Sequence, residues 1–192
     1  MSNKVTFGLR NVHIAFRTDA ETPTWETPVA IPGAVRFTPT PTGEDSKFYA
    51  DDTLYFVVST NDGYTAEIEF AHLPDTTMAT MLGWDTDDNG MLVENADAVP
   101  KRFALLGEVQ GDDKNRRFVY YDVQAQRPTK EHTTKAETTT PVTNSIPLTC
   151  MPLTLGEGEA AKNIVKGDLE LSTTNADQYN GFFDSVYTPV FT

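Results

Sequence analysis

The sequence predicts a mainly β fold: a two-sheet β-sandwich or barrel with one short flanking α-helix and long extended loops or arms. Several short stretches alternate apolar and polar residues, as strands with one buried face do. Clusters of Asn, Asp and Gly separate these stretches. A single segment, Pro74–Gly83, has residues typical of both ends of a helix. The 192 residues suffice for one buried core, so we expect a single β domain over residues 1–192.

The first strand is expected at Gly8–Arg17. Val12, Ile14 and Phe16 fall on one face of it, and His13 falls on the other. A second strand follows at Val29–Thr40, where Pro32 and Gly33 indicate a sheet edge or a bulge.

A β-hairpin is predicted next. Its strands are Thr53–Ser59 and Tyr64–Leu73, joined by a positive-φ turn at Asn61-Asp62-Gly63. The second strand has two unlike faces. The core face is predicted to carry Tyr64, Ala66, Ile68 and Phe70, and the solvent-exposed, acidic face Thr65, Glu67, Glu69 and Ala71.

The one short helix is predicted at Pro74–Gly83, because proline suits a first turn and glycine a carboxyl-terminal cap. Leu73, Met78, Met81 and Leu82 would then pack on a sheet. A second hairpin is expected from Lys101–Gln110 and Arg116–Gln126 around a Gly-Asp-Asp-Lys-Asn turn. In simple alternation, Phe118, Tyr120 and Asp122 share one of its faces, and Val119, Tyr121 and Val123 share the other.

Residues 127–155 are expected to form a long extended segment that ends in a strand returning to the core. Residues 127–155 are rich in Thr and Pro, and five apolar residues near their end favour a returning strand: Ile146, Leu148, Met151, Leu153 and Leu155. A short strand follows at Asp168–Ser172. A terminal helix is expected at Asn175–Val186, within a carboxyl-terminal extension of residues 174–192.

Negative charge is concentrated in one quarter of the chain. The whole chain carries −13, and the stretch from Phe48 to Pro100 holds eleven carboxylates and no Lys or Arg. Such acidity argues against binding free nucleic acid, which requires cations to neutralise phosphates. Either a solvated acidic surface or a wall along which phosphates slide is consistent with it.

The sequence contains no motif for a catalytic site, so we expect no enzyme, no cofactor and no metal. Asp85, Asp87 and Asn89 resemble the start of a calcium loop, but Ala96 occupies the position that needs a bidentate Glu. Cys150 is the only cysteine, so no intrachain disulfide forms. With no membrane-length apolar run and no signal-peptide core, we expect a soluble protein made in a cytoplasm.

Four stretches carry a resemblance to a known family: Phe7–Phe16, Pro32–Val35, Phe48–Asp52 through Tyr64–Phe70, and Lys101–Tyr121. Through them, most of the chain up to about Leu155 resembles the major tail proteins, or tail tube proteins, of long-tailed, non-contractile bacteriophages. The resemblance implies six copies in a ring, and rings stacked into a tube with an acidic bore through which genome DNA leaves. The implied partners are further copies, tape-measure, tail-tip and tail-terminator proteins, with DNA passing unbound and no membrane. The resemblance also implies that the protein is in the host cytoplasm before assembly and in the tail tube of the virion afterwards.

The resemblance implies two groups of functional residues, acids that face the bore and residues that contact neighbouring subunits. Those expected to face the bore are Glu67, Glu69, Asp51, Asp52 and Asp62, although Asp51 and Asp52 would alternatively pair with Arg116 or Arg117 at the ring interface. Residues 39–52 and 129–144 are candidate inter-subunit arms, and the second holds the candidates Thr138, Thr140 and Val142. Neutralising Glu67 and Glu69 is expected to leave tubes intact and to slow DNA ejection.

Two rival interpretations remain. A tube protein of a phage-derived secretion or injection system would share this architecture and deliver protein. A monomeric carbohydrate-binding or adhesion β-sandwich would use exposed aromatic rings, for which Trp25 and Trp84 are the candidates.

Overall fold

A computed structural model describes residues 3–19, 22–130, 134, 143–156 and 161–190. Its strands are β1 (Thr6–Asp19), β2 (Thr24–Trp25), β3 (Val29–Ala30), β4 (Ala34–Thr42), β5 (Asp45–Ala50), β6 (Thr53–Ser59), β7 (Gly63–Phe70), β8 (Asp85–Thr86), β9 (Leu92–Val93), β10 (Arg102–Gly111), β11 (Arg116–Ala125), β12 (Asn144–Met151), β13 (Leu153–Leu155), β14 (Lys162–Ile164) and β15 (Lys166–Glu170). The helical elements are α1 (Asp75–Leu82), α2 (Ala176–Asn180) and the 3₁₀ turn η2 (Gly181–Phe183).

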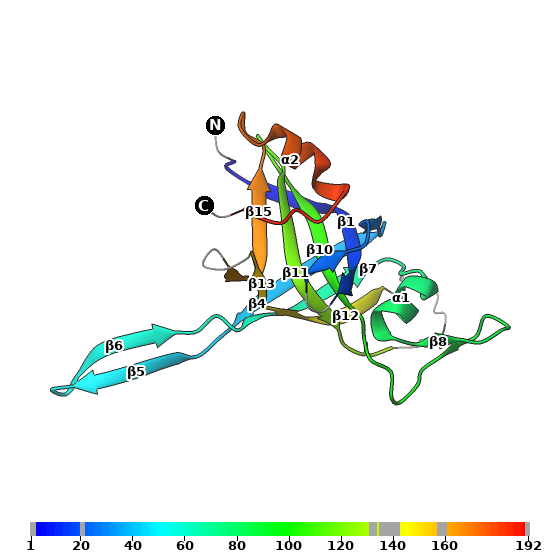
Figure 1. Ribbon diagram of the computed structural model, residues 1–192, viewed down its shortest axis with the longest axis horizontal. Helices are drawn as coiled ribbons and strands as arrows, with labels where there is room; N and C mark the ends of the chain where they lie inside the picture. Colours follow the sequence, from blue (N-terminus) through cyan, green and yellow to red (C-terminus); the bar gives the residue numbers. More distant parts are fainter. Residues whose placement is uncertain (1–2, 20–21, 131–133, 135–142, 157–160, 191–192) are drawn as a thin grey trace.

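Nine strands form one antiparallel sheet in the order β2-β1-β10-β11-β12-β7-β4, with β3 added to β1 and β15 to β11. The sheet curls, so that β1 and β4, far apart in this order, contact each other. Three two-stranded sheets, β5–β6, β8–β9 and β13–β14, complete the described part of the chain. The prediction of a mainly β fold is confirmed (Figure 1).

Two apolar clusters lie on opposite faces of the curled sheet. The larger cluster contains Val12, Ile14, Ile68 and Phe70, as the alternation in their strands predicted, together with apolar residues of α1. The smaller cluster contains Val119 and Tyr121 and is covered by the carboxyl-terminal segment. The hydroxyl of Tyr121 donates a hydrogen bond to the Tyr187 carbonyl at 3.1 Å, and burial raises the pKa of Tyr121 to about 12.

Both ends of helix α1 match the prediction. Pro74 precedes it, and Gly83 follows in the left-handed conformation, with φ 69° and a backbone N–H bonded to the Ala79 carbonyl. A Cβ at Gly83 would lie 2.4 Å from the Val99 carbonyl oxygen, so both the backbone angle and the space require glycine. Met81 and Leu82 are buried against the sheet, as expected.

The predicted hairpin of Thr53–Ser59 with Tyr64–Leu73 is wrong. Strand β6 pairs with β5, and β7 lies between β4 and β12 in the main sheet. The chain runs outward along β4 and β5, turns at Asp51-Asp52, and returns along β6 and β7. Asn61-Asp62-Gly63 is therefore the point where the returning strand enters the main sheet, and the β5–β6 hairpin extends away from the body (Figure 1).

A β-bulge changes the predicted faces of β11. Phe103 pairs with Val123 and Leu105 with Tyr120, so β11 has one extra residue at Tyr121-Asp122. Val123 consequently joins the larger cluster, away from Val119 and Tyr121. The carboxylate of Asp122 is buried and accepts a hydrogen bond from Arg102 at 2.7 Å.

The predicted terminal helix Asn175–Val186 is shorter and in two parts, because α2 ends at Asn180 and the 3₁₀ turn η2 follows. Its apolar stripe is nevertheless used, since Tyr179 and Phe182 are buried. The strand predicted at Asp168–Ser172 corresponds to β15, displaced by two residues. Within the described ranges, no helix is long and apolar enough to span a bilayer.

Candidate functional site

The β5–β6 hairpin, here called the arm, exposes an unusual amount of apolar surface. Seven large side chains on it are exposed, with fractions from 42% to 73%: Phe48, Tyr49, Leu54, Tyr55, Phe56, Val57 and Val58. None of them belongs to either core cluster. An isolated two-stranded hairpin is at best marginally stable in water, and soluble monomers rarely expose such contiguous patches. The arm is therefore a contiguous apolar surface that the described part of the chain leaves exposed.

Both faces of the arm are apolar. Phe48 lies opposite Phe56, whereas Tyr55 and Val57 alternate to the other face of β6. Strand β6 also contains no charge or proline, the features that normally prevent an edge strand from pairing with other chains. A partner that covers only one face would leave the other exposed.

The base of the arm is joined tightly to the body. The Thr60 N–H donates to the Glu44 carbonyl at 3.0 Å, and the Asp62 N–H donates to the Thr42 carbonyl at 3.0 Å. A Cβ at Gly43 would lie 2.1 Å from the Thr60 carbonyl oxygen, so glycine is required for this close approach. The backbone hydrogen-bond ladder thus continues from the body into the arm.

The predicted bore-facing acids occupy three separate places. Asp51 and Asp52 form the turn at the arm tip, in left-handed conformations with φ of 50° and 58°. Asp62 lies at the arm base, where its carboxylate accepts from the Thr60 hydroxyl at 3.3 Å. Glu67 and Glu69 lie on the outer face of β7, as the alternation predicted.

Glu67 and Glu69 are partly neutralised by a neighbouring cation. The Arg36 guanidinium on β4 lies 3.8 Å from Glu67 and 3.4 Å from Glu69. Ser145 donates to Glu67, and Thr143 donates to Glu69 at 2.6 Å. The face is polar and hydrogen-bonded, with a smaller negative field than the two carboxylates alone would produce.

Arg116 and Arg117, the predicted inter-subunit cations, both have partners within the chain. Arg116 bonds the Glu170 carboxylate on β15. Arg117 is 15% exposed, bonds Glu108 at 2.9 Å and donates to the Tyr179 carbonyl. Its guanidinium also lies 3.9 Å from the centroid of the Tyr179 ring, a cation–π contact that holds α2 on the sheet.

A cleft of about 390 Å³ lies beside this arginine, and we call it the basic cleft. Its walls carry three cations and two carboxylates: Arg10, Lys114, Arg117, Glu108 and Asp113. Glu108 is buried, and its two oxygens are bonded by the Arg10 and Arg117 Nε atoms at 2.6 and 2.9 Å. One carboxylate therefore serves two guanidinium groups.

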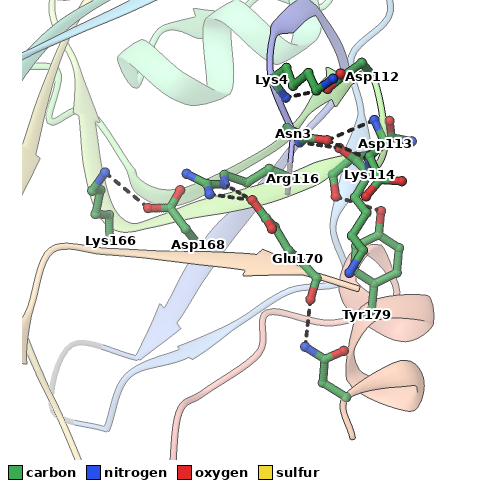
Figure 2. A network of polar contacts seen from close by, with 12 residues as sticks. Asn3, Lys4, Asp112, Asp113, Lys114, Arg116, Lys166, Asp168, Glu170 and Tyr179 are labelled. Carbon is green, nitrogen blue, oxygen red and sulfur yellow. Dashed lines mark hydrogen bonds and ion pairs between the residues drawn. The ribbon is translucent and has the colours of Figure 1, made fainter. Parts of the chain in front are cut away.

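The rim of the basic cleft is fixed by the amino-terminal segment (Figure 2). The Asn3 amide donates to the Lys114 carbonyl at 2.7 Å, and its oxygen accepts from the N–H groups of Asp113 and Lys114 at 3.0 and 2.7 Å. The Tyr179 hydroxyl donates to the Asn115 carbonyl at 3.2 Å from the other side. The β10–β11 turn is thus held from both sides.

The calcium-like segment forms a tight turn between β8 and β9. The Asp87 carboxylate accepts from the N–H groups of Met91 and Asn89 at 2.7 and 2.9 Å. The Met91 N–H is the main cause that lowers the pKa of Asp87 below its usual value. Across the residues that the structure describes, no three metal-ligating side chains are grouped.

The two tryptophans of the carbohydrate-binding alternative are partly buried. The Trp25 indole N–H donates to the Tyr121 carbonyl at 3.2 Å. Trp84 packs on the larger cluster, and the Lys130 ammonium lies 5.1 Å from its ring centroid. Neither ring is a free platform of the kind that sugar binding uses.

Some predicted residues lie outside the described part of the chain. Thr138, Thr140 and Val142, with most of the candidate arm at 129–144, belong to this group. The candidate arm at 39–52 is displaced in the structure, because Pro39–Thr42 belong to β4 and pair with β7.

Sequence reasoning missed the basic cleft and the extent of the arm. The signal for the arm is the charge-free apolar run Leu54–Val58, which the sequence pattern places in a hairpin with Tyr64–Leu73. Arg10, Lys114 and Asn3 carry no pattern in the sequence, because the fold brings them together from segments about a hundred residues apart.

Comparison with protein-family models gives no match, and comparison with curated proteins gives none either. The observations that bear on function are therefore the geometry of the arm and of the basic cleft, together with the resemblance described above.

Proposed function

We propose that this chain is a structural subunit that assembles with copies of itself into the tail tube of a long-tailed bacteriophage. The arm is the observation that supports this proposal most directly. Covering a large apolar side chain contributes about 1.5–3 kcal/mol, so burial of several arm residues would offset the cost of association. The resemblance to tail tube proteins supplies the specific architecture, six-membered rings stacked into a tube.

The form of the arm also fits assembly into an extended object. The arm leaves the body on one side (Figure 1). A second copy that receives this arm would therefore use a different part of its own surface. A contact between two different surfaces is heterologous, and repetition of it gives closed rings or open filaments. A hairpin with two apolar faces suits a position between neighbouring copies.

In the proposed tube, Glu67 and Glu69 would face the bore. Their exposed strand face and the chain's charge of −13 support this placement. Repulsion over the screening length of about 8–10 Å would keep DNA from adhering to the wall. Arg36 would reduce this repulsion locally.

Negative-stain electron microscopy of the concentrated, purified protein tests the proposal. We expect hollow rings or tubes of one constant diameter, since a single repeated contact fixes the geometry. Compact dimers or single globular particles at every concentration would refute a tube. Sugar binding by such particles, detected in a glycan screen, would favour the carbohydrate-binding alternative.

A further inference from the structure

The arm tip and the basic cleft have opposite chemical character. The tip presents two adjacent carboxylates, Asp51 and Asp52, beside exposed Tyr49 and Leu54. The cleft presents Arg10, Lys114 and Arg117 next to the exposed side chain of Leu171. In a chain of net charge −13, a cleft in which cations outnumber carboxylates is a local exception.

We propose that Asp51 and Asp52 at the arm tip of one copy dock in the basic cleft of a second copy. This inference rests on the proposed function, because it names the partner surface of the arm in the assembly. It requires no other protein and no ligand.

The contact has to form between copies. The arm tip lies at one extreme of the molecule, whereas α2, which borders the cleft, lies on another side of the body (Figure 1). The arm ladder is continuous with β4 and β7 at its base, so the arm does not fold back onto its own chain.

The cleft has donors to spare for a carboxylate. Glu108 occupies the Nε atoms of Arg10 and Arg117, while the Arg10 side chain remains 43% exposed. The Lys114 side chain makes no ion pair with any described residue. Guanidinium groups bind carboxylates through paired hydrogen bonds, and an ammonium adds a point charge.

Hydrogen bonds to backbone carbonyls are present at both the cleft rim and the arm tip. Asn3 and Tyr179 hold the cleft rim, and the Thr53 hydroxyl donates to the Ala50 carbonyl at 3.0 Å across the arm tip. A backbone held in this way loses less conformational entropy on docking than a free loop would. Apolar residues behind the tip would then cover the exposed Leu171.

A cross-linking experiment with the full-length chain tests the contact directly. The Asp52→Cys and Lys114→Cys variants, one of them carrying a size tag, are mixed and oxidised mildly, and mixed dimers are quantified on a non-reducing gel. The matched control pairs Asp88→Cys with Lys114→Cys, because Asp88 is also an exposed acid in a turn. Cys150 is buried, so it contributes little background.

We expect at least about tenfold more mixed dimer from the Asp52 pair than from the control pair. Equal yields in a sample that forms large particles would overturn this inference and leave the proposed function standing. A specific cross-link in a sample that stops at small oligomers would support the docking and contradict the tube. Equal yields with no particles would contradict both.

A charge exchange provides a second test. Asp52→Lys and Lys114→Glu should each raise the protein concentration at which half of the chains assemble by about tenfold. The double variant should return to within about threefold of the wild type, because the ion pair is restored in reverse. Additive losses in the double variant would overturn the proposed pairing. Circular dichroism of each variant checks that the β fold is intact.

Discussion

Arg117 joins the curled sheet to the carboxyl-terminal segment through four contacts of different kinds. Its guanidinium bonds the buried Glu108 and the Tyr179 carbonyl, and it lies over the rings of Tyr179 and Phe183. Loss of this residue would remove half of the charge compensation of a buried carboxylate, which is costly in a low-dielectric interior.

Arg117→Ala should therefore lower the free energy of unfolding by about 3 kcal/mol. The neighbouring Arg116→Ala is the control, because Arg116 is 52% exposed and its pair with Glu170 is solvated, so its loss should cost less than about 1 kcal/mol. Urea unfolding followed by circular dichroism measures both. Equal losses in the two variants would show that Arg117 stabilises the fold no more than a solvated surface arginine does.

The reactivity of Cys150 tests whether the middle of the sheet is buried. Its side chain is 1% exposed, and burial raises the pKa of the Cys150 thiol to about 12. Because the thiolate is the reactive form, alkylation at about pH 8 should be at least about a hundredfold slower in the native protein than in urea. Mass spectrometry of timed samples measures the rates, and rapid native alkylation would contradict the buried position.

The residue-scale details that the sequence did not predict are irregularities in the strands. Simple alternation placed Val12, Ile14 and Ile68 correctly, because those positions follow the two-residue period. It failed at Val123, since a bulge adds one residue, and nothing local in Tyr121-Asp122 marks it. Asp122 is held there by arginines from other strands, which a strand's own sequence does not reveal.

At the scale of elements, the two ends of α1 were predictable because helix ends have local chemistry. Gly83 adopts φ 69° and lies close to the Val99 carbonyl. Gly90 has a similar φ of 84°, but a Cβ there would meet nothing within 4 Å. The two glycines therefore separate the cost of the backbone angle from the cost of the close contact.

Gly83→Ala should lower the free energy of unfolding by more than about 2 kcal/mol, whereas Gly90→Ala should cost about 1 kcal/mol. Thermal or urea unfolding of the two variants measures the difference. Equal costs would mean that Val99 moves away freely and that only the backbone angle matters.

The local sequence favours the wrong turn for the arm, because two turn candidates lie close together in the chain. Asn61-Asp62-Gly63 has the residues that hairpin turns prefer, and the local rule favours it over Asp51-Asp52. The structure uses Asp51-Asp52, although left-handed aspartates are less common than glycine there. The pairing of β7 with both β4 and β12 decides the outcome, and such long-range pairing has no local signature.

At the scale of the whole molecule, the distribution of apolar surface separates two parts. The body has two buried clusters and is complete without the arm, whereas the arm has no cluster of its own. The mainly β class, the α1 helix and the polar face of β7 were predictable from pattern. The separation of body and arm was not, because the sequence of an apolar strand does not show whether the strand packs in the core or is exposed.

The arm replacement is the most direct test of the claim that the arm drives self-association. Thr42 lies opposite Gly63, so residues 43–62 can be replaced by an Asn-Gly turn that preserves the β4–β7 register. Light scattering should then show large particles for the wild-type chain at high concentration and a monomer at all concentrations for the replaced chain, with both chains folded by circular dichroism. Particles of equal size from the two chains would contradict the account.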